Sequence, residues 1–203
     1  MRAATLLALL MSGCIATPAP AALPEASYRY RATLVREAHA AWGLSAPVAT
    51  FAAQVHQESH WRSNVTSSAG AAGMTQVMPD TARWLASVEP SLSPATPTNP
   101  QWSLRAMLVY DRWLWQRIKA RDDCQRMAKA LRAYNGGLGW LRRDEQLATA
   151  KGIDPDINFG QLDTVNAGRS LPAWRENVSY PRLILLSHEP RYIAAGFGGG
   201  VCA

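Results

Sequence analysis

The apolar residues of this chain recur at three- and four-residue spacing in segment after segment, and no useful stretch alternates apolar with polar residues. In residues 47–60, Val48, Phe51, Ala52 and Val55 fall on one face of a helix. The same reasoning predicts further helices over 28–42, from Pro79, over 103–120, 122–134 and 140–150, and from near Pro181. The pattern therefore predicts an all-α (mainly α) fold.

The segments between these helices are rich in small and polar residues. Residues 62–78 carry two glycines among small and polar residues and predict a structured loop, and residues 152–172 show no period and predict a long loop. With 203 residues, 48% of them apolar, the chain is long enough for one packed domain and too apolar for general disorder. We expect an export segment over 1–21, one domain over 22–192, and a Gly-rich tail over 193–203, in which residues 196–200 are mobile.

The N-terminus has the order of a secretory signal. Met1 and Arg2 precede an apolar stretch over 3–15, which is too short to cross a bilayer as an ordinary helix. Met11-Ser12-Gly13-Cys14 resembles a bacterial lipobox, in which the cysteine is lipidated, while Ala19-Pro20-Ala21 offers a competing cleavage site and a retained anchor is a third reading. We expect an exported, periplasmic protein, with membrane attachment through lipidated Cys14 as an outer-membrane lipoprotein.

The charge distribution bears on which partners the protein can bind, and the cysteine content bears on the cellular compartment in which it functions. The net charge is +6, from 21 basic and 15 acidic residues, but the basic residues form no run, so no nucleic-acid partner is expected. Once Cys14 is lipidated or removed, Cys124 and Cys202 remain, and an even pair can form a disulfide in an oxidising compartment. The sequence leaves open whether they meet.

Two chemistries compete for residues 54–61. His56 and His60 are four residues apart, which suits two ligands of one metal ion. However, Gln57 stands where the zinc-protease motif has Glu, so we expect no metal and no cofactor. Glu58 lies near the end of the predicted helix, and no other acid follows until Asp80. Burial of this isolated carboxyl would raise its pKa and suit it to act as a general acid.

Residues 57–82 resemble the soluble lytic transglycosylases, the bacterial relatives of goose-type lysozyme. The matching positions are Glu58-Ser59, Ser67, Gly70-Ala71, Gly73-Met74-Thr75-Gln76, Met78-Pro79 and Thr81-Ala82. Further blocks match at Asn99-Pro100, at 133–137 (Ala-Tyr-Asn-Gly-Gly) and, weakly, at 176–181, so the resemblance spans about residues 30–190. Thr75 replaces a usual Met, as a change in the cleft floor, and Asn177-Val178 replace Thr-Arg.

The resemblance implies a lysozyme-like helical domain with a substrate cleft, over residues 22–192. Its activity would be cleavage of the β-1,4 bond between N-acetylmuramic acid and N-acetylglucosamine in peptidoglycan glycan strands, forming a 1,6-anhydro sugar. Glu58 would be the single catalytic residue, acting first as general acid and then as base. The other implied positions contact substrate (Ser67, Gln76, Met78, Tyr134 and Glu176) or support the motif (Ser59, Gly73 and Asn135).

Three alternatives remain open at this point. A hydrolytic goose-type lysozyme or phage endolysin would share the fold but leave reducing ends in place of anhydro ends. A non-catalytic peptidoglycan-binding module would not need the intact Glu58. A zinc hydrolase would use His56 and His60, and chelators would inhibit it. The biological role and the choice between exo and endo cleavage do not follow from the sequence.

Overall fold

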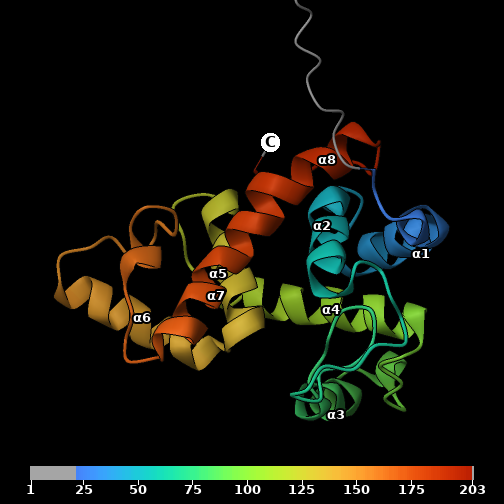
Figure 1. Cartoon of the computed structure of the whole chain (residues 1–203), viewed down its shortest axis with the longest axis horizontal. Helices are drawn as coiled ribbons and strands as arrows, with labels where there is room; N and C mark the ends of the chain where they lie inside the picture. Colours follow the sequence, from blue (N-terminus) through green and yellow to red (C-terminus); the bar gives the residue numbers. More distant parts are fainter. Residues whose placement is uncertain (1–21, 203) are drawn as a thin grey trace, which may run out of the picture.

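The computed structural model describes residues 22–202, which form helices joined by irregular segments (Figure 1). The α-helices are α1 (Glu25–Trp42), α2 (Val48–Ser59), α3 (Pro79–Val88), α4 (Pro100–Trp115), α5 (Asp123–Gly136), α6 (Leu138–Ala150), α7 (Leu171–Pro181) and α8 (Glu189–Ala194). Two short 3₁₀ helices, η1 (Pro90–Leu92) and η2 (Leu162–Thr164), and one π-helical segment, η3 (Arg182–His188), complete the order. The β pairing within residues 22–202 consists of two isolated bridges, Thr66–Ala72 and Ala72–Val77. The predicted all-α class is confirmed.

Local signals explain where several helices begin. The side chains of Asn99, Asp122 and Ser170 each accept a hydrogen bond from a backbone N–H of the first turn of α4, α5 and α7. Pro79 and Pro100 occupy first helical positions, where the missing N–H costs nothing. The starts of α3, α4 and α5 lie within a few residues of their predicted positions.

Helix α2 lies at the centre of the molecule. It stands between α1 on one side and the α7–α8 run on the other, with α4 crossing below it (Figure 1). Its residues from Val48 to His56 are all buried, and they contribute to one large core. A second, smaller core lies under α3 and includes Leu85, Leu92 and Trp102. A residue at the C-terminal end of α2 is therefore held by packing on several sides.

The last helix differs from the prediction. It begins at Leu171, ten residues before Pro181, and α7, η3 and α8 follow one another without a break to Ala194. The Ser170 side chain caps this start, and Pro172 fits the first turn. Pro181 cannot donate an N–H within the helix, and the chain continues from it as the π-helical η3.

The tail also differs from the prediction, because residues 196–202 are packed against the core. Phe197 is buried, and the Gly199 carbonyl accepts a hydrogen bond of 3.1 Å from the backbone N–H of Ala49. Cys202 forms a disulfide with Cys124, which answers the question that the sequence left open. The expectation of a mobile tail followed glycine content alone and gave too little weight to Phe197 and Cys202.

The export segment and Cys14 lie outside the described residues. Across residues 22–202, no helix combines the length and the apolar character needed to traverse a bilayer.

Candidate active site

Glu58 is the penultimate residue of α2. The helix stops there because His60 and Trp61 adopt left-handed backbone angles, with φ of 53° and 66°. Trp61 is buried, and its indole N–H donates to the Tyr192 hydroxyl at 2.7 Å. The chain is thereby turned into the 62–78 loop, and Glu58 is fixed at the edge of the core.

The carboxyl of Glu58 faces a small pocket of about 200 Å³. The pocket is lined by Gln57, Glu58, Asn135, Glu176, Ser179, Tyr180 and Leu183. The buried Tyr180 hydroxyl donates a hydrogen bond to Oε1 of Glu58. Burial raises the pKa of Glu58 to about 8, with the nearby charge of Glu176 adding to the rise and the Tyr180 hydrogen bond opposing it. At neutral pH this carboxyl therefore carries a proton that it can donate.

The loop that follows α2 is stabilised by hydrogen bonds from side chains to its own backbone carbonyls. The Ser59 hydroxyl donates to the Met74 carbonyl at 2.6 Å, which ties the helix end to the loop. Gly73 has φ of 79°, and any Cβ there would overlap the carbonyl of Pro97. Gln76 also has a positive φ, and its side-chain amide donates to the Gly73 carbonyl at 2.8 Å. This explains why the motif has glycine at position 73.

Thr75 corrects an expectation. It is fully buried and hydrogen-bonds to Ser103 on α4, with 2.9 Å between the two hydroxyl oxygens, so it is not part of a cleft floor. Its carbonyl accepts the Tyr134 hydroxyl at 2.7 Å. Burial, together with the nearby charge of Glu58, raises the pKa of Tyr134 well above its ordinary value. Tyr134 is thus fixed close to Glu58 by the loop backbone.

Glu176 is held in the pocket by α5. The side-chain amide of Asn135 donates to Oε1 of Glu176 at 3.2 Å, and Nδ2 of Asn177 donates to the side-chain oxygen Oδ1 of Asn135 at 2.9 Å. Asn177 is itself buried and accepts hydrogen bonds from the side chains of Arg132 (3.1 Å) and Arg169 (2.7 Å). Asn177, which departs from the family pattern, therefore anchors the network that holds Glu176.

The structure brings together some of the expected residues and separates others. Glu58, Asn135 and Glu176 line one pocket. Ser67 is exposed on the loop, where its hydroxyl accepts the N–H of Ala71 at 3.0 Å. Met78 is 44% exposed beside the start of α3. These two residues and Gln76 do not line the pocket of Glu58.

Three polar residues near Glu58 escaped sequence reasoning. Tyr180 lies 122 residues from its partner Glu58, in the weakest of the matching blocks. Asp111 and Gln54 are fully buried, and Nε2 of Gln54 donates to Oδ1 of Asp111 at 3.4 Å. The sequence did contain a signal for these two residues, because Asp111 is an acid within the apolar segment of α4 and Gln54 is an amide on the apolar face of α2.

The two histidines considered as metal ligands belong to a packed cluster. His56 stacks on His188, with ring centroids 4.4 Å apart, and lies 4.8 Å from His60. Nδ1 of His56 is 2.9 Å from the Tyr192 hydroxyl, and burial lowers the pKa of His56 to about 4. Within residues 22–202, no three or more His, Cys, Asp or Glu side chains are grouped so that they could hold a metal ion.

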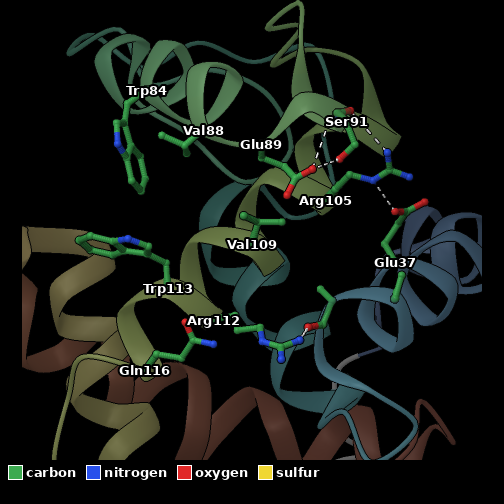
Figure 2. Close-up of a pocket in the computed structure, with 12 residues that line it drawn as sticks. Glu37, Trp84, Val88, Glu89, Ser91, Arg105, Val109, Arg112, Trp113 and Gln116 are labelled. Atoms are coloured by element: carbon green, nitrogen blue, oxygen red, sulfur yellow. Dashed lines mark hydrogen bonds and ion pairs between the residues drawn. The ribbon is translucent and has the colours of Figure 1, made fainter.

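A larger cavity of about 880 Å³ lies between α1, α3 and α4 (Figure 2). The indoles of Trp84 and Trp113 form one side, and Glu37 and Arg105 the other. Glu37 accepts hydrogen bonds from Nε of Arg105 at 2.7 Å and from Gln101 at 2.9 Å. The charges of Glu37 and Arg105 are thus paired with each other, and the cavity shares no residue with the Glu58 pocket.

Comparison with proteins of known sequence and structure places this geometry in context. The chain is 32% identical over 145 residues to the membrane-bound lytic murein transglycosylase F of Mannheimia succiniciproducens, covering 70% of this chain and 26% of that protein. The protein of the same name from Haemophilus influenzae is 30% identical over 143 residues, with the same coverage. The chain therefore spans about a quarter of the length of these relatives.

The fold is similar to part of a solved enzyme. The 70 kDa soluble lytic transglycosylase of Escherichia coli superposes with a TM-score of 0.60 at 20% identity, over 85% of this chain and 25% of that one. The sequence model of the transglycosylase SLT domain matches residues 34–157, which include Glu58, the 62–78 loop and Tyr134. By this match over more than half of its length, the chain belongs to the transglycosylase SLT domain family.

Proposed function

We propose that the chain is a peptidoglycan lytic transglycosylase, in which Glu58 is the single general acid and base. The observation that carries the proposal is a carboxyl at the end of a buried helix, open to a pocket and with its pKa raised to about 8. Such a carboxyl group is protonated at neutral pH and can act as a general acid. Because it is a weak acid, the carboxylate left after it has given up its proton can act as a general base. Both steps of the reaction require this.

In the first step, Glu58 donates its proton to the glycosidic oxygen between N-acetylmuramic acid and N-acetylglucosamine. The C–O bond breaks, and the muramic ring develops oxocarbenium character. In the second step, the C6 hydroxyl of the same ring attacks C1, and the Glu58 carboxylate takes up the hydroxyl proton. The product is a 1,6-anhydro sugar, no water is consumed, and Glu58 regains its starting state.

The neighbours of Glu58 have separate tasks in this proposal. Tyr180 donates its hydroxyl proton toward Glu58, which orients the carboxyl and stabilises the anion formed by the first step. Glu176, held by Asn135, lines the same pocket and hydrogen-bonds the sugar. Tyr134 closes over the reacting ring from the loop side. Ser67, Gln76 and Met78 bind the glycan farther along the loop, outside the small pocket.

Mass analysis of digested peptidoglycan tests the reaction. Purified sacculi incubated with the protein should yield muropeptides that end in 1,6-anhydro-N-acetylmuramic acid. Muropeptides with reducing ends would assign the protein to the hydrolytic lysozymes or endolysins. Binding to sacculi without any released product would instead identify a non-catalytic binding module.

We further propose that the protein acts in the periplasm and is attached to a membrane through lipidated Cys14. The support is the apolar stretch followed by Ser12-Gly13-Cys14. Expressed in a bacterium fed labelled palmitate, the protein should carry label that Cys14→Ser removes. An unmodified N-terminus near Ala22, found by mass spectrometry, would contradict the lipid attachment and favour ordinary signal cleavage.

A further inference from the structure

We infer that Asp111 and Gln54 form an uncharged, doubly hydrogen-bonded acid–amide pair that positions Glu58 and keeps its surroundings neutral. The inference rests on the proposed role of Glu58. Gln54 precedes Glu58 by one helical turn on α2, and Asp111 faces it from α4. The pair thus joins the catalytic helix to the helix that crosses below it.

Unsatisfied atoms carry the inference. Both side chains are 0% exposed, and Nε2 of Gln54 donates to Oδ1 of Asp111. The other oxygen of each, Oε1 of Gln54 and Oδ2 of Asp111, is buried and has no hydrogen-bond partner. Two acceptors cannot satisfy each other, and a buried polar atom without a partner is costly.

A single proton removes both defects. If Oδ2 of Asp111 carries a hydrogen, it can donate to Oε1 of Gln54 while Oδ1 accepts from Nε2. The two groups then form a closed ring with two hydrogen bonds, and every polar atom of the pair has a partner. An ionised Asp111 would leave one acceptor of each side chain unsatisfied and place a bare charge in the core.

The charges around Asp111 favour the same state. The titratable groups that face it are Glu58 on α2, Tyr134 on α5, Tyr180 on α7 and its neighbour Tyr110, and none of these side chains can carry a positive charge. Within residues 22–202, Asp111 has no ion pair. Burial raises the pKa of Asp111 well above its ordinary value, the hydrogen bond from Gln54 opposes the rise, and Glu58 adds to it.

The consequence concerns the first chemical step. When Glu58 gives up its proton it becomes an anion, and a second anion one helix away would oppose that transfer. A neutral Asp111 removes this repulsion while the pair still fixes α2 against α4. Asp111 is therefore a positioning residue, which acts on the substrate only through Glu58.

Substitution by Asn separates the neutral state from the ionised one. Asp111→Asn keeps both hydrogen bonds to Gln54, because the new amide donates to Oε1 and accepts from Nε2, but it cannot titrate. Asp111→Ala removes both bonds and should lower kcat by about tenfold or more through misplacement of Glu58. Asn should restore most of that loss and leave the alkaline limb of the pH–rate profile in place.

Stability against pH provides a readout that needs no activity. The Glu58→Gln background removes the titration of Glu58, and Asp111→Asn is compared within it. Folded Asp111 keeps its proton where the unfolded chain loses it, so the native state loses stability as pH rises above about 4. The folding equilibrium constant of the Glu58→Gln variant, which retains Asp111, should therefore fall by up to tenfold per pH unit relative to the variant that also carries Asp111→Asn. This corresponds to about 1.4 kcal/mol of unfolding free energy per pH unit.

Asp144→Asn is the matched control. Asp144 is equally buried but ion-paired with Arg132 and Arg169, so its Asn variant should lose stability at neutral pH. The inference is overturned if Asp111→Asn and its parent show parallel stability between pH 5 and 8, or if Asn moves the alkaline limb to lower pH. If Glu58→Gln proves active, the proposed function fails, while the stability comparison still reports the state of Asp111.

Discussion

At Glu58, three local influences act on one carboxyl group. Burial and the charge of Glu176 favour the protonated form, whereas the hydrogen bond from Tyr180 favours the anion. Burial is the largest of the three, so the pKa settles near 8 and not in the ordinary carboxyl range. The same surroundings that favour protonated Glu58 would also supply a donor, Tyr180, for the anion that the proposed reaction creates.

Replacement of Glu58 by Gln should abolish lysis of peptidoglycan without unfolding the protein. The amide keeps the size of the carboxyl but can neither give nor recover the proton, so the loss should reach or exceed about 10²–10⁴-fold. Loss of turbidity of a sacculus suspension measures activity, and circular dichroism reports the fold. Glu176→Gln, in the same pocket, is the control and should lose less. Near-normal turnover of the Glu58 variant would refute the proton-transfer role.

Tyr180→Phe should move the pH dependence of the reaction. The Tyr180 hydrogen bond lowers the pKa of Glu58, so its removal raises that pKa further. Activity requires protonated Glu58 and falls as pH rises through its pKa, so the alkaline limb of kcat should shift to higher pH. The maximum rate should fall as well, because the anion loses a donor. A limb that stays in place would show that the hydroxyl does not act on Glu58.

At the level of single residues, the sequence predicted only some of the side chains around Glu58. Glu58, Asn135 and Glu176, which line one pocket in the structure, were predicted as site residues because each lies in a short block with fixed spacing. Tyr180 and Asp111 were missed because their contacts with α2 join residues far apart in the chain. A hydrogen bond of that kind depends on packing, and no local pattern encodes it.

At the scale of elements, the helix starts were predictable and one long helix was not. Asn99, Asp122 and Pro79 are caps or first-turn residues whose effect is local. Pro181 was read as a helix start because proline is common there, yet it lies inside the run from Leu171 to Ala194. The helical run accommodates this proline because the π-helical η3 follows it. No local sequence pattern predicts that change of helix type.

The loop between α2 and α3 yields a prediction of its own. Gly73→Ala should destabilise the protein by about 2–4 kcal/mol, because φ is 79° and the new Cβ would overlap the Pro97 carbonyl. Activity should fall with it, since this loop holds Tyr134 through Thr75. Denaturant unfolding gives the free energy. Gly139→Ala, in α6 with open space around it, should cost nothing, and equal losses in both variants would argue against a special role for Gly73.

At the scale of the whole molecule, the tail and the central helix stabilise each other. The backbone N–H groups of Val201 and Cys202 donate to the buried Glu189 carboxylate at 3.2 and 3.1 Å. Gly199 meets the start of α2, and Cys202 is bonded to Cys124 at the start of α5. The tail thus joins α2, α5 and α8, and the helix that carries Glu58 is held at the end opposite to the pocket.

Loss of the Cys124–Cys202 bond should lower stability more than activity. The disulfide joins residues 78 positions apart, and closure of a loop of that length is worth about 4 kcal/mol by chain entropy alone. Cys202→Ser should therefore lower the free energy of unfolding by about 2–4 kcal/mol, while activity at 25 °C changes little because the bond lies away from the Glu58 pocket. Thermal unfolding with and without dithiothreitol makes the measurement.

Reductant should lower the Tm of the unaltered protein to that of the Cys202→Ser variant and leave the Tm of the variant unchanged. Equal melting of the two proteins under oxidising conditions, or two thiols titrated in the denatured, unreduced protein, would contradict the bond and its role in fixing the tail.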